Sequence, residues 1–222
     1  SLTVVVQSAS VTSSSVGPVG VALYLPNTPV NSLTILIDSL TVISSETQSQ
    51  SPINSRSRGC YILSTSSIHQ LQLHMENLIV SAIGDPAVGV DFTSVKSITD
   101  STIFVEGDIQ SHQIAGGITF NAFIDPDLSS LINSTVEFVG SLTSQWSELL
   151  NGGIFLTFNT SPNPPILSST TLHANVMGNV TTGSLFGIAI TSKKTADSLN
   201  YGMVWEDVTI LCEGSLTTLN GT

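Results

Sequence analysis

Positive charge is what this sequence has least of. Lys and Arg supply 5 of its 222 residues against 16 for Asp and Glu, and charged residues make up 9% of the chain, where about 25% is usual. Five dispersed cations cannot build a face that neutralises phosphates or anionic lipid headgroups, so the sequence argues against nucleic-acid and membrane-surface partners. No run of about 18 apolar residues exists from which a membrane span could form.

Apolar residues are nevertheless abundant, at 41% of the chain, which is enough to bury a core and argues against a disordered acidic chain. A glycine followed by the pattern hydrophobic, any residue, hydrophobic recurs along the chain at intervals of 28 to 39 residues. These repeats begin at Gly20, Gly59, Gly89, Gly117, Gly153 and Gly187. A conserved place for glycine in every repeat is typical of a corner with positive φ, or of a close approach between neighbouring coils.

A second marker alternates with the first. It is a short polar residue followed by an alternating, β-branched segment, and it occurs in residues 38–42, 76–80, 100–107, 133–140, 173–178 and 206–214, with residues 1–6 as one more copy. Period-2 alternation with no helical periodicity predicts β-strands, at least two in each repeat.

Two all-β architectures remain, a right-handed parallel β-helix of about six coils and a β-sandwich or jelly roll. A sandwich repeats hairpins at a spacing of about 8–12 residues with tight turns, whereas a solenoid repeats a longer unit and stacks equivalent residues. The glycine pattern favours the β-helix, as a single domain over residues 1–222.

The β-helix register predicts inward columns of stacked side chains. The first strand of each repeat supplies one column of Val21, Cys60, Val90, Ile118, Ile154 and Ile188, and another of Leu23, Ile62, Phe92, Phe120, Leu156 and Ile190. The second strand supplies Ile103, Val136, Ala174 and Ile210, then Val105, Phe138, Val176 and Cys212. The outward residues Asp91, Thr119, Phe155 and Ala189 do not form the regular threonine array that an ice-binding β-helix needs.

The register also predicts the state of both cysteines. Cys60 and Cys212 fall at inward positions four rungs apart, about 19 Å at the usual strand spacing, and a disulfide needs Cα atoms within about 7 Å. We expect two buried free thiols.

Four N-glycosylation sequons begin at Asn133, Asn159, Asn179 and Asn220. Asn133 and Asn159 fall at outward strand positions and Asn179 follows Gly178, so we expect exposed sites of the kind that glycans require. Such glycans would make the protein a secreted or cell-surface glycoprotein.

Neither end of the sequence has the pattern expected of a segment that caps a solenoid. Because an uncapped terminal rung presents a strand edge that pairs with other chains, the expected partners are further copies or repeats of the same chain, end to end. The 222 residues would then be an excerpt or repeating unit of a longer array.

Motifs for catalysis are scarce. The acidic and basic motifs of pectate-lyase-like and polygalacturonase-like β-helices do not occur, and no nucleophile elbow or phosphate loop is present. Arg56 and Arg58 could meet a carboxylate, but solvated loop charges are the expectation. Asp125–Pro126–Asp127 is expected to start a turn and His112 to belong to a surface cluster, so we expect no cofactor and no metal. The alternative is a carbohydrate-active β-helix enzyme with an unrecognised site.

The repeated strand motif resembles the β-helical repeat surface proteins of single-celled eukaryotes, such as the trypanosomatid dispersed-gene-family surface proteins. Residues 133–140 (NSTVEFVG) and 206–211 (EDVTIL) carry the resemblance. It implies an exported, glycosylated, non-catalytic component of a surface or fibre. With the residues themselves, it predicts a structural or adhesive module that assembles through open solenoid ends or side-face contacts, with a possible carbohydrate or cell-surface ligand.

Overall fold

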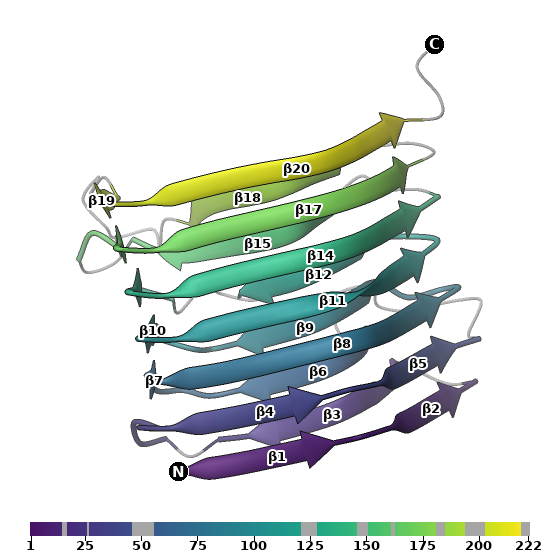
Figure 1. Ribbon diagram of the computed structural model, residues 1–222, viewed down its shortest axis with the longest axis horizontal. Helices are drawn as coiled ribbons and strands as arrows, with labels where there is room; N and C mark the ends of the chain where they lie inside the picture. The colour runs from purple at the N-terminus through teal and green to yellow at the C-terminus, as the bar shows by residue number, and fades with distance from the viewer. Residues whose placement is uncertain are drawn as a thin grey trace.

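The chain is a β-solenoid. The computed structural model describes residues 1–222 apart from 15–16, 26, 46–55, 121–127, 146–150, 161–162, 181–184, 194–202 and 219–222. Strands are the regular elements of this part of the chain, and the strand pairs are parallel (Figure 1). The predicted parallel β-helix is therefore confirmed over the β-sandwich, whose hairpins would be antiparallel. The described residues contain no helix that could cross a membrane.

The strands form three sheets. Sheet A contains β1 (Leu2–Val6), β2 (Ala9–Ser13), β4 (Leu33–Ile37), β5 (Leu40–Ser44), β8 (Leu71–Ala82), β11 (Thr102–Ser111), β14 (Thr135–Ser144), β17 (Thr171–Val180) and β20 (Thr209–Thr218). Sheet B contains β3 (Val19–Tyr24), β6 (Ser57–Leu63), β9 (Ala87–Thr93), β12 (Ala115–Phe120), β15 (Asn151–Asn159) and β18 (Leu185–Lys193). Sheet C contains β7 (Ile68–His69), β10 (Ser97–Thr99), β13 (Ser130–Ile132), β16 (Ile166–Ser168) and β19 (Val204–Glu206).

Each coil passes from sheet B through sheet C to sheet A. The described residues make five coils with a strand on all three sides, from β6–β8 to β18–β20, rather than six. The coil before them has an isolated bridge at Val30 in place of a sheet C strand. Sheet C was not predicted, because its strands of two or three residues are too short to show an alternation.

The inward columns of sheet B are those predicted. Strand pairing aligns Val21, Cys60, Val90, Ile118, Ile154 and Ile188, and likewise Leu23, Ile62, Phe92, Phe120, Leu156 and Ile190. The rings of Phe92 and Phe120 stack with their centroids 4.6 Å apart. Both columns lie in one continuous hydrophobic core.

The columns predicted for sheet A contain an error of two residues in β17. Leu172, not Ala174, aligns with Val136 and Ile210, and Ala174, not Val176, aligns with Phe138 and Cys212. The prediction matched Gly178 to the glycines of the neighbouring strands, but Val176 holds that position, between Gly140 and Gly214. A shift of two residues keeps every side chain on its face, so the alternation itself gave no warning.

The six repeat glycines are explained by close packing and not by positive φ, because none of them has a φ in the left-handed range. A Cβ on Gly59 would lie 2.8 Å from a methyl group of Leu78 in sheet A and 2.6 Å from the Gly89 carbonyl oxygen of the next coil. Gly117 faces the Phe138 ring and Gly187 faces the Cys212 sulfur in the same way. Sheets A and B therefore pack closely against each other along this glycine column.

The corner between sheets C and A repeats a left-handed residue. Asp100, Asn133 and Asp207 have φ of 53°, 48° and 50° there, and short polar side chains tolerate this conformation better than others do. After Asp100 and Asn133 the next residue is a buried serine: Ser101 Oγ donates to the Thr99 carbonyl oxygen at 2.7 Å, and Ser134 repeats the bond one coil on. These bonds satisfy polar groups that the corner buries.

Candidate functional site

Both arginines of the chain converge on one carboxylate on the outer face of sheet B. Arg58 Nε donates to Asp91 Oδ2 at 2.7 Å, and Arg56 Nη1 donates to the same oxygen at 3.2 Å. Thr119 Oγ1 donates to Asp91 Oδ1 at 2.8 Å. The cluster joins β6, β9 and β12. The expectation of solvated loop charges is therefore wrong, and the other possibility, that the arginines meet a carboxylate, is confirmed.

Burial makes this ionic cluster tight. The side chains of Arg56 and Asp91 are each 1% exposed and that of Arg58 is 12% exposed. Desolvation lowers the pKa of Arg56, and the facing Asp91 carboxylate opposes that shift. The Arg58 guanidinium also lies over the Tyr61 ring, 4.7 Å from its centroid. Because three donors already occupy Asp91, this carboxylate is a structural clamp between coils and is poorly placed to act as a base.

A groove crosses the outer face of sheet A. It has a volume of about 510 Å³ and runs over β8, β11, β14 and β17, with Asn77, Ile79, Glu106, Asp108, Asn175 and Met177 among its lining side chains. Two of these strands are irregular here: β8 has a bulge opposite β11, where Asn77 has a φ of 48°, and Gly140 of β14 has a φ of +151°. Both residues line the groove.

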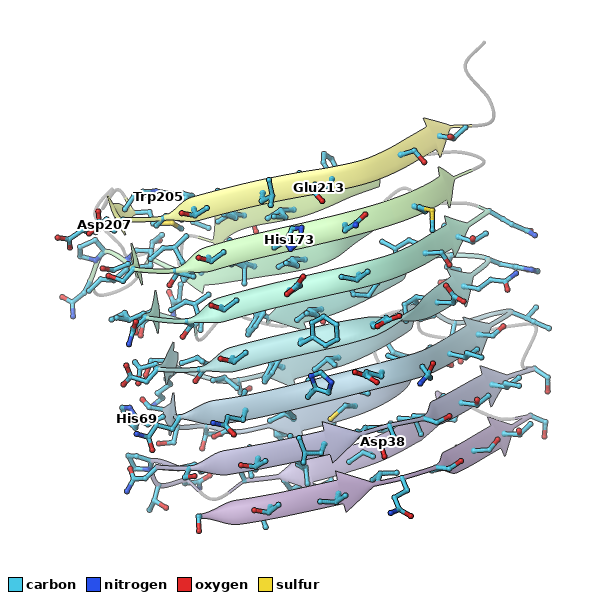
Figure 2. The ribbon with its side chains drawn as sticks, in the orientation of Figure 1. Asp38, His69, His173, Trp205, Asp207 and Glu213 are labelled. Carbon is cyan, nitrogen blue, oxygen red and sulfur yellow. The ribbon has the colours of Figure 1, made fainter. Side chains whose placement is uncertain are left out.

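The outer face of sheet A carries acidic groups and histidines. His74 Nε2 lies 2.8 Å from Glu76 Oε1, and His173 Nδ1 lies 2.9 Å from Glu137 Oε1. His173 Nε2 is 3.7 Å from Glu213 Oε2 on the next coil, and Figure 2 shows both side chains on this face. None of the nine strands of sheet A contains Lys or Arg.

In the described part of the chain, no three His, Cys, Asp or Glu side chains lie close enough together to hold a metal ion. Glu106 and Asp108 line the groove, whereas His112 follows β11 in the corner towards sheet B. Asp125–Pro126–Asp127 lies outside the described residues.

The cysteines differ from each other. Neither forms a disulfide, as predicted, and Cys60 is buried, with a pKa raised to about 12 by desolvation. Cys212 is exposed, so the prediction of a buried thiol is wrong there. Its register in the inward column is that of Ala174, and its sulfur packs on Gly187. It is exposed because no described coil covers β20.

The sequon asparagines lie in different settings. Asn133 is exposed at the corner before β14, where its Nδ2 donates to Asp100 Oδ1 at 2.6 Å. Asn159 is half-buried at the end of β15, and its neighbour Thr160 is buried. Asn179 lies within β17, opposite Thr143 and Thr217, so Gly178 before it is a strand residue and not a corner. Asn220 is outside the described residues.

Sequence reasoning missed the arginine cluster and the groove. The glycine register contained a partial signal for the first, because it places Gly59 and Gly89 on adjacent coils and so brings Arg58 and Asp91 onto neighbouring strands. The groove had no such signal, since its lining comes from four strands of successive coils. No protein-family model, curated protein or solved structure matches this chain.

Proposed function

We propose that this chain is a non-catalytic structural and adhesive module of an extracellular surface protein or filament, which assembles by stacking further coils on its terminal coil (β18–β20). The observation that carries the proposal is the exposure of inward-facing side chains in that coil. Ile210 and Trp205 are 48% and 49% exposed, whereas Leu172 and Leu167, their counterparts one coil earlier, are fully buried.

The terminal coil also has open strand edges. Among the described residues, β18, β19 and β20 each pair with a strand on one side only, and so do β1, β2 and β3 at the other end (Figure 1). An added coil would satisfy one row of backbone groups in each sheet and cover the apolar side chains of the terminal coil. Full burial of one such side chain contributes about 1.5–3 kcal/mol. Stacking is therefore favoured both by new backbone hydrogen bonds and by the burial of apolar side chains.

The distribution of charge supports a non-catalytic module over a carbohydrate-active lyase. An enzyme of that kind needs a basic residue in its groove to remove a proton from the substrate. The groove on sheet A has carboxylates, while both arginines are held by Asp91 on sheet B. The Ser- and Thr-rich outer face of sheet A would instead keep the sides of the module solvated.

An extracellular location is the part of the proposal that the sequons support, together with the resemblance to the repeat surface proteins of single-celled eukaryotes. Asn133 is the best placed acceptor, since its side chain is exposed at the corner before β14. Peptide-level mass spectrometry of native material, with and without glycan release, tests it. We expect a glycan at Asn133, and a bare Asn133 in native material would count against export through a glycosylating pathway.

Stacking is tested by sedimentation velocity over a range of protein concentrations. We expect reversible association, which Ile210→Lys on the terminal coil weakens because it places a charge where a further coil would pack. Ile43→Lys is the matched control, since Ile43 is an exposed isoleucine of sheet A on the outer face. Trp205→Ala, which adds no charge, should also weaken association. A wild-type chain that stays monomeric, or equal association of all variants, would contradict the proposal.

A further inference from the structure

The groove on sheet A lies away from the terminal coil, so it offers a second way for the module to meet a partner. It is lined by β8, β11, β14 and β17, which are neighbours in sheet A, and so it runs across the strands, along the solenoid axis. Four strands at the usual spacing give it a length of about 14 Å. That is the length of about four residues of extended peptide.

The negative charge of the outer face of sheet A indicates which kind of ligand the groove can bind. The strands of sheet A carry the carboxylates of Glu76, Glu106, Asp108, Glu137 and Glu213, and no Lys or Arg. Histidines partner Glu76 and Glu137, and His173 also approaches Glu213. Glu106, which lines the groove, has no ion-pair or hydrogen-bond partner among the described side chains, and Asp108 accepts only the Ser141 hydroxyl. The groove therefore offers carboxylate oxygens that a cation would satisfy, and it would repel an anionic polymer.

Apolar side chains stand beside these carboxylates. Ile79 and Met177 line the groove and are 46% and 64% exposed. Lys and Arg combine a long aliphatic stem with a charged head, so a neighbouring apolar surface and carboxylate can engage both parts of one side chain. The backbone groups of these central strands are already paired on both sides, so a ligand would be held by side chains and not by adding a strand.

We propose that this groove binds an extended peptide segment bearing several Lys or Arg residues, supplied by a partner protein. The ammonium or guanidinium groups pair with Glu106 and Asp108, and the aliphatic stems lie on Ile79 and Met177. This site goes beyond stacking and is independent of it, because none of the four residues belongs to the terminal coil.

The test uses the full chain and a fluorescent heptapeptide of alternating Ser and Lys, with Ser-Gln and Ser-Glu versions as probes of charge. Binding is followed by anisotropy at low and at physiological salt. We expect the Lys peptide to bind, more weakly as salt rises, and the other two not to bind. The double variant Glu106→Gln/Asp108→Asn should weaken binding about tenfold.

A matched double variant separates the groove from the overall negative charge of the protein. Glu206→Gln/Asp207→Asn removes the same charge near sheet C, and Figure 2 shows Asp207 at that edge of the solenoid. We expect it to change binding by less than about twofold. Met177→Lys, which places a cation in the groove, should also weaken binding while Ile43→Lys does not.

Three results would overturn the proposal. Equal losses in the two double variants would mean that the peptide responds only to net charge. Equal binding of the Gln peptide, or displacement of the Lys peptide by a neutral oligosaccharide, would mean that the groove takes a neutral ligand. If the Lys peptide did not bind even at low salt, the groove would not be a site for basic peptides. Each readout is separate from sedimentation, so failure of stacking and failure of the groove are distinguished.

Discussion

Phe138 and Cys212 occupy the same inward column of sheet A, two coils apart, yet Phe138 is fully buried and Cys212 is exposed. The two side chains face the same way. What differs is that, within the described residues, Phe138 has a coil on either side of it and Cys212 has one on a single side. The comparison teaches that strand alternation decides the direction of a side chain in a solenoid, whereas neighbouring coils decide its burial.

Truncation of apolar side chains gives the largest expected contrast between the middle and the end of the stack. Phe138→Ala should lower the free energy of unfolding by about 3–5 kcal/mol, because it leaves a cavity between packed coils. Ile210→Ala, in the half-exposed terminal coil, should cost about 1 kcal/mol or less. Urea unfolding of both variants measures the difference. Equal losses would mean that the terminal coil is covered as fully as the middle.

For charged side chains, too, the cost of a substitution should depend on how deeply the coils bury the side chain. Asp91→Asn removes the carboxylate charge that pairs with both Arg56 and Arg58, and we expect a loss of about 3–5 kcal/mol from breaking this buried ionic cluster. Asp108→Asn removes an equal charge from the exposed groove and should change stability by less than about 0.5 kcal/mol. The same unfolding assay compares them. A near-neutral Asp91→Asn would contradict a buried clamp between coils.

Two adjacent glycines of β12, Gly116 and Gly117, allow tight and loose packing to be compared within one strand of a middle coil. Gly117→Ala pushes a methyl group into the Phe138 ring and should cost about 1–3 kcal/mol. Gly116→Ala meets Thr119 Cγ2 at 3.2 Å as its nearest neighbour and should leave stability within about 1 kcal/mol of wild type. Thermal unfolding of the two variants measures the difference in stability. Equal effects would argue that sheets A and B are farther apart than the glycine column indicates.

The parts of the fold that sequence predicted are those governed by local repetition. Both sheet B columns were correct because a glycine marks the same place in every coil, and steric contact with sheet A requires it there. In sheet A the marker is less regular. Val176 takes the place of a glycine in β17, and an alignment anchored on Gly178 was therefore wrong by two residues.

The parts that sequence did not predict depend on contacts between coils. Arg56 and Arg58 precede Asp91 by more than 30 residues, and nothing in a solvated-loop interpretation indicates that the outer face of sheet B is buried there. The exposure of Cys212 likewise depends on what lies beyond its strand and not on its own register. The groove is lined by residues of four successive coils, so no single repeat contains it.

Thiol labelling is the most direct test of a stack that is sealed in the middle and open at its terminal coil. Cys60 is buried, and its raised pKa leaves almost no thiolate near neutral pH, so only Cys212 should react in dilute native protein. Labelling should slow as the protein concentration rises and coils stack over Cys212. Denaturation without reductant should then release the second thiol. We therefore predict one reactive thiol in the native chain and two in the unfolded chain, whereas two reactive native thiols, or a Cys60–Cys212 disulfide, would contradict the account.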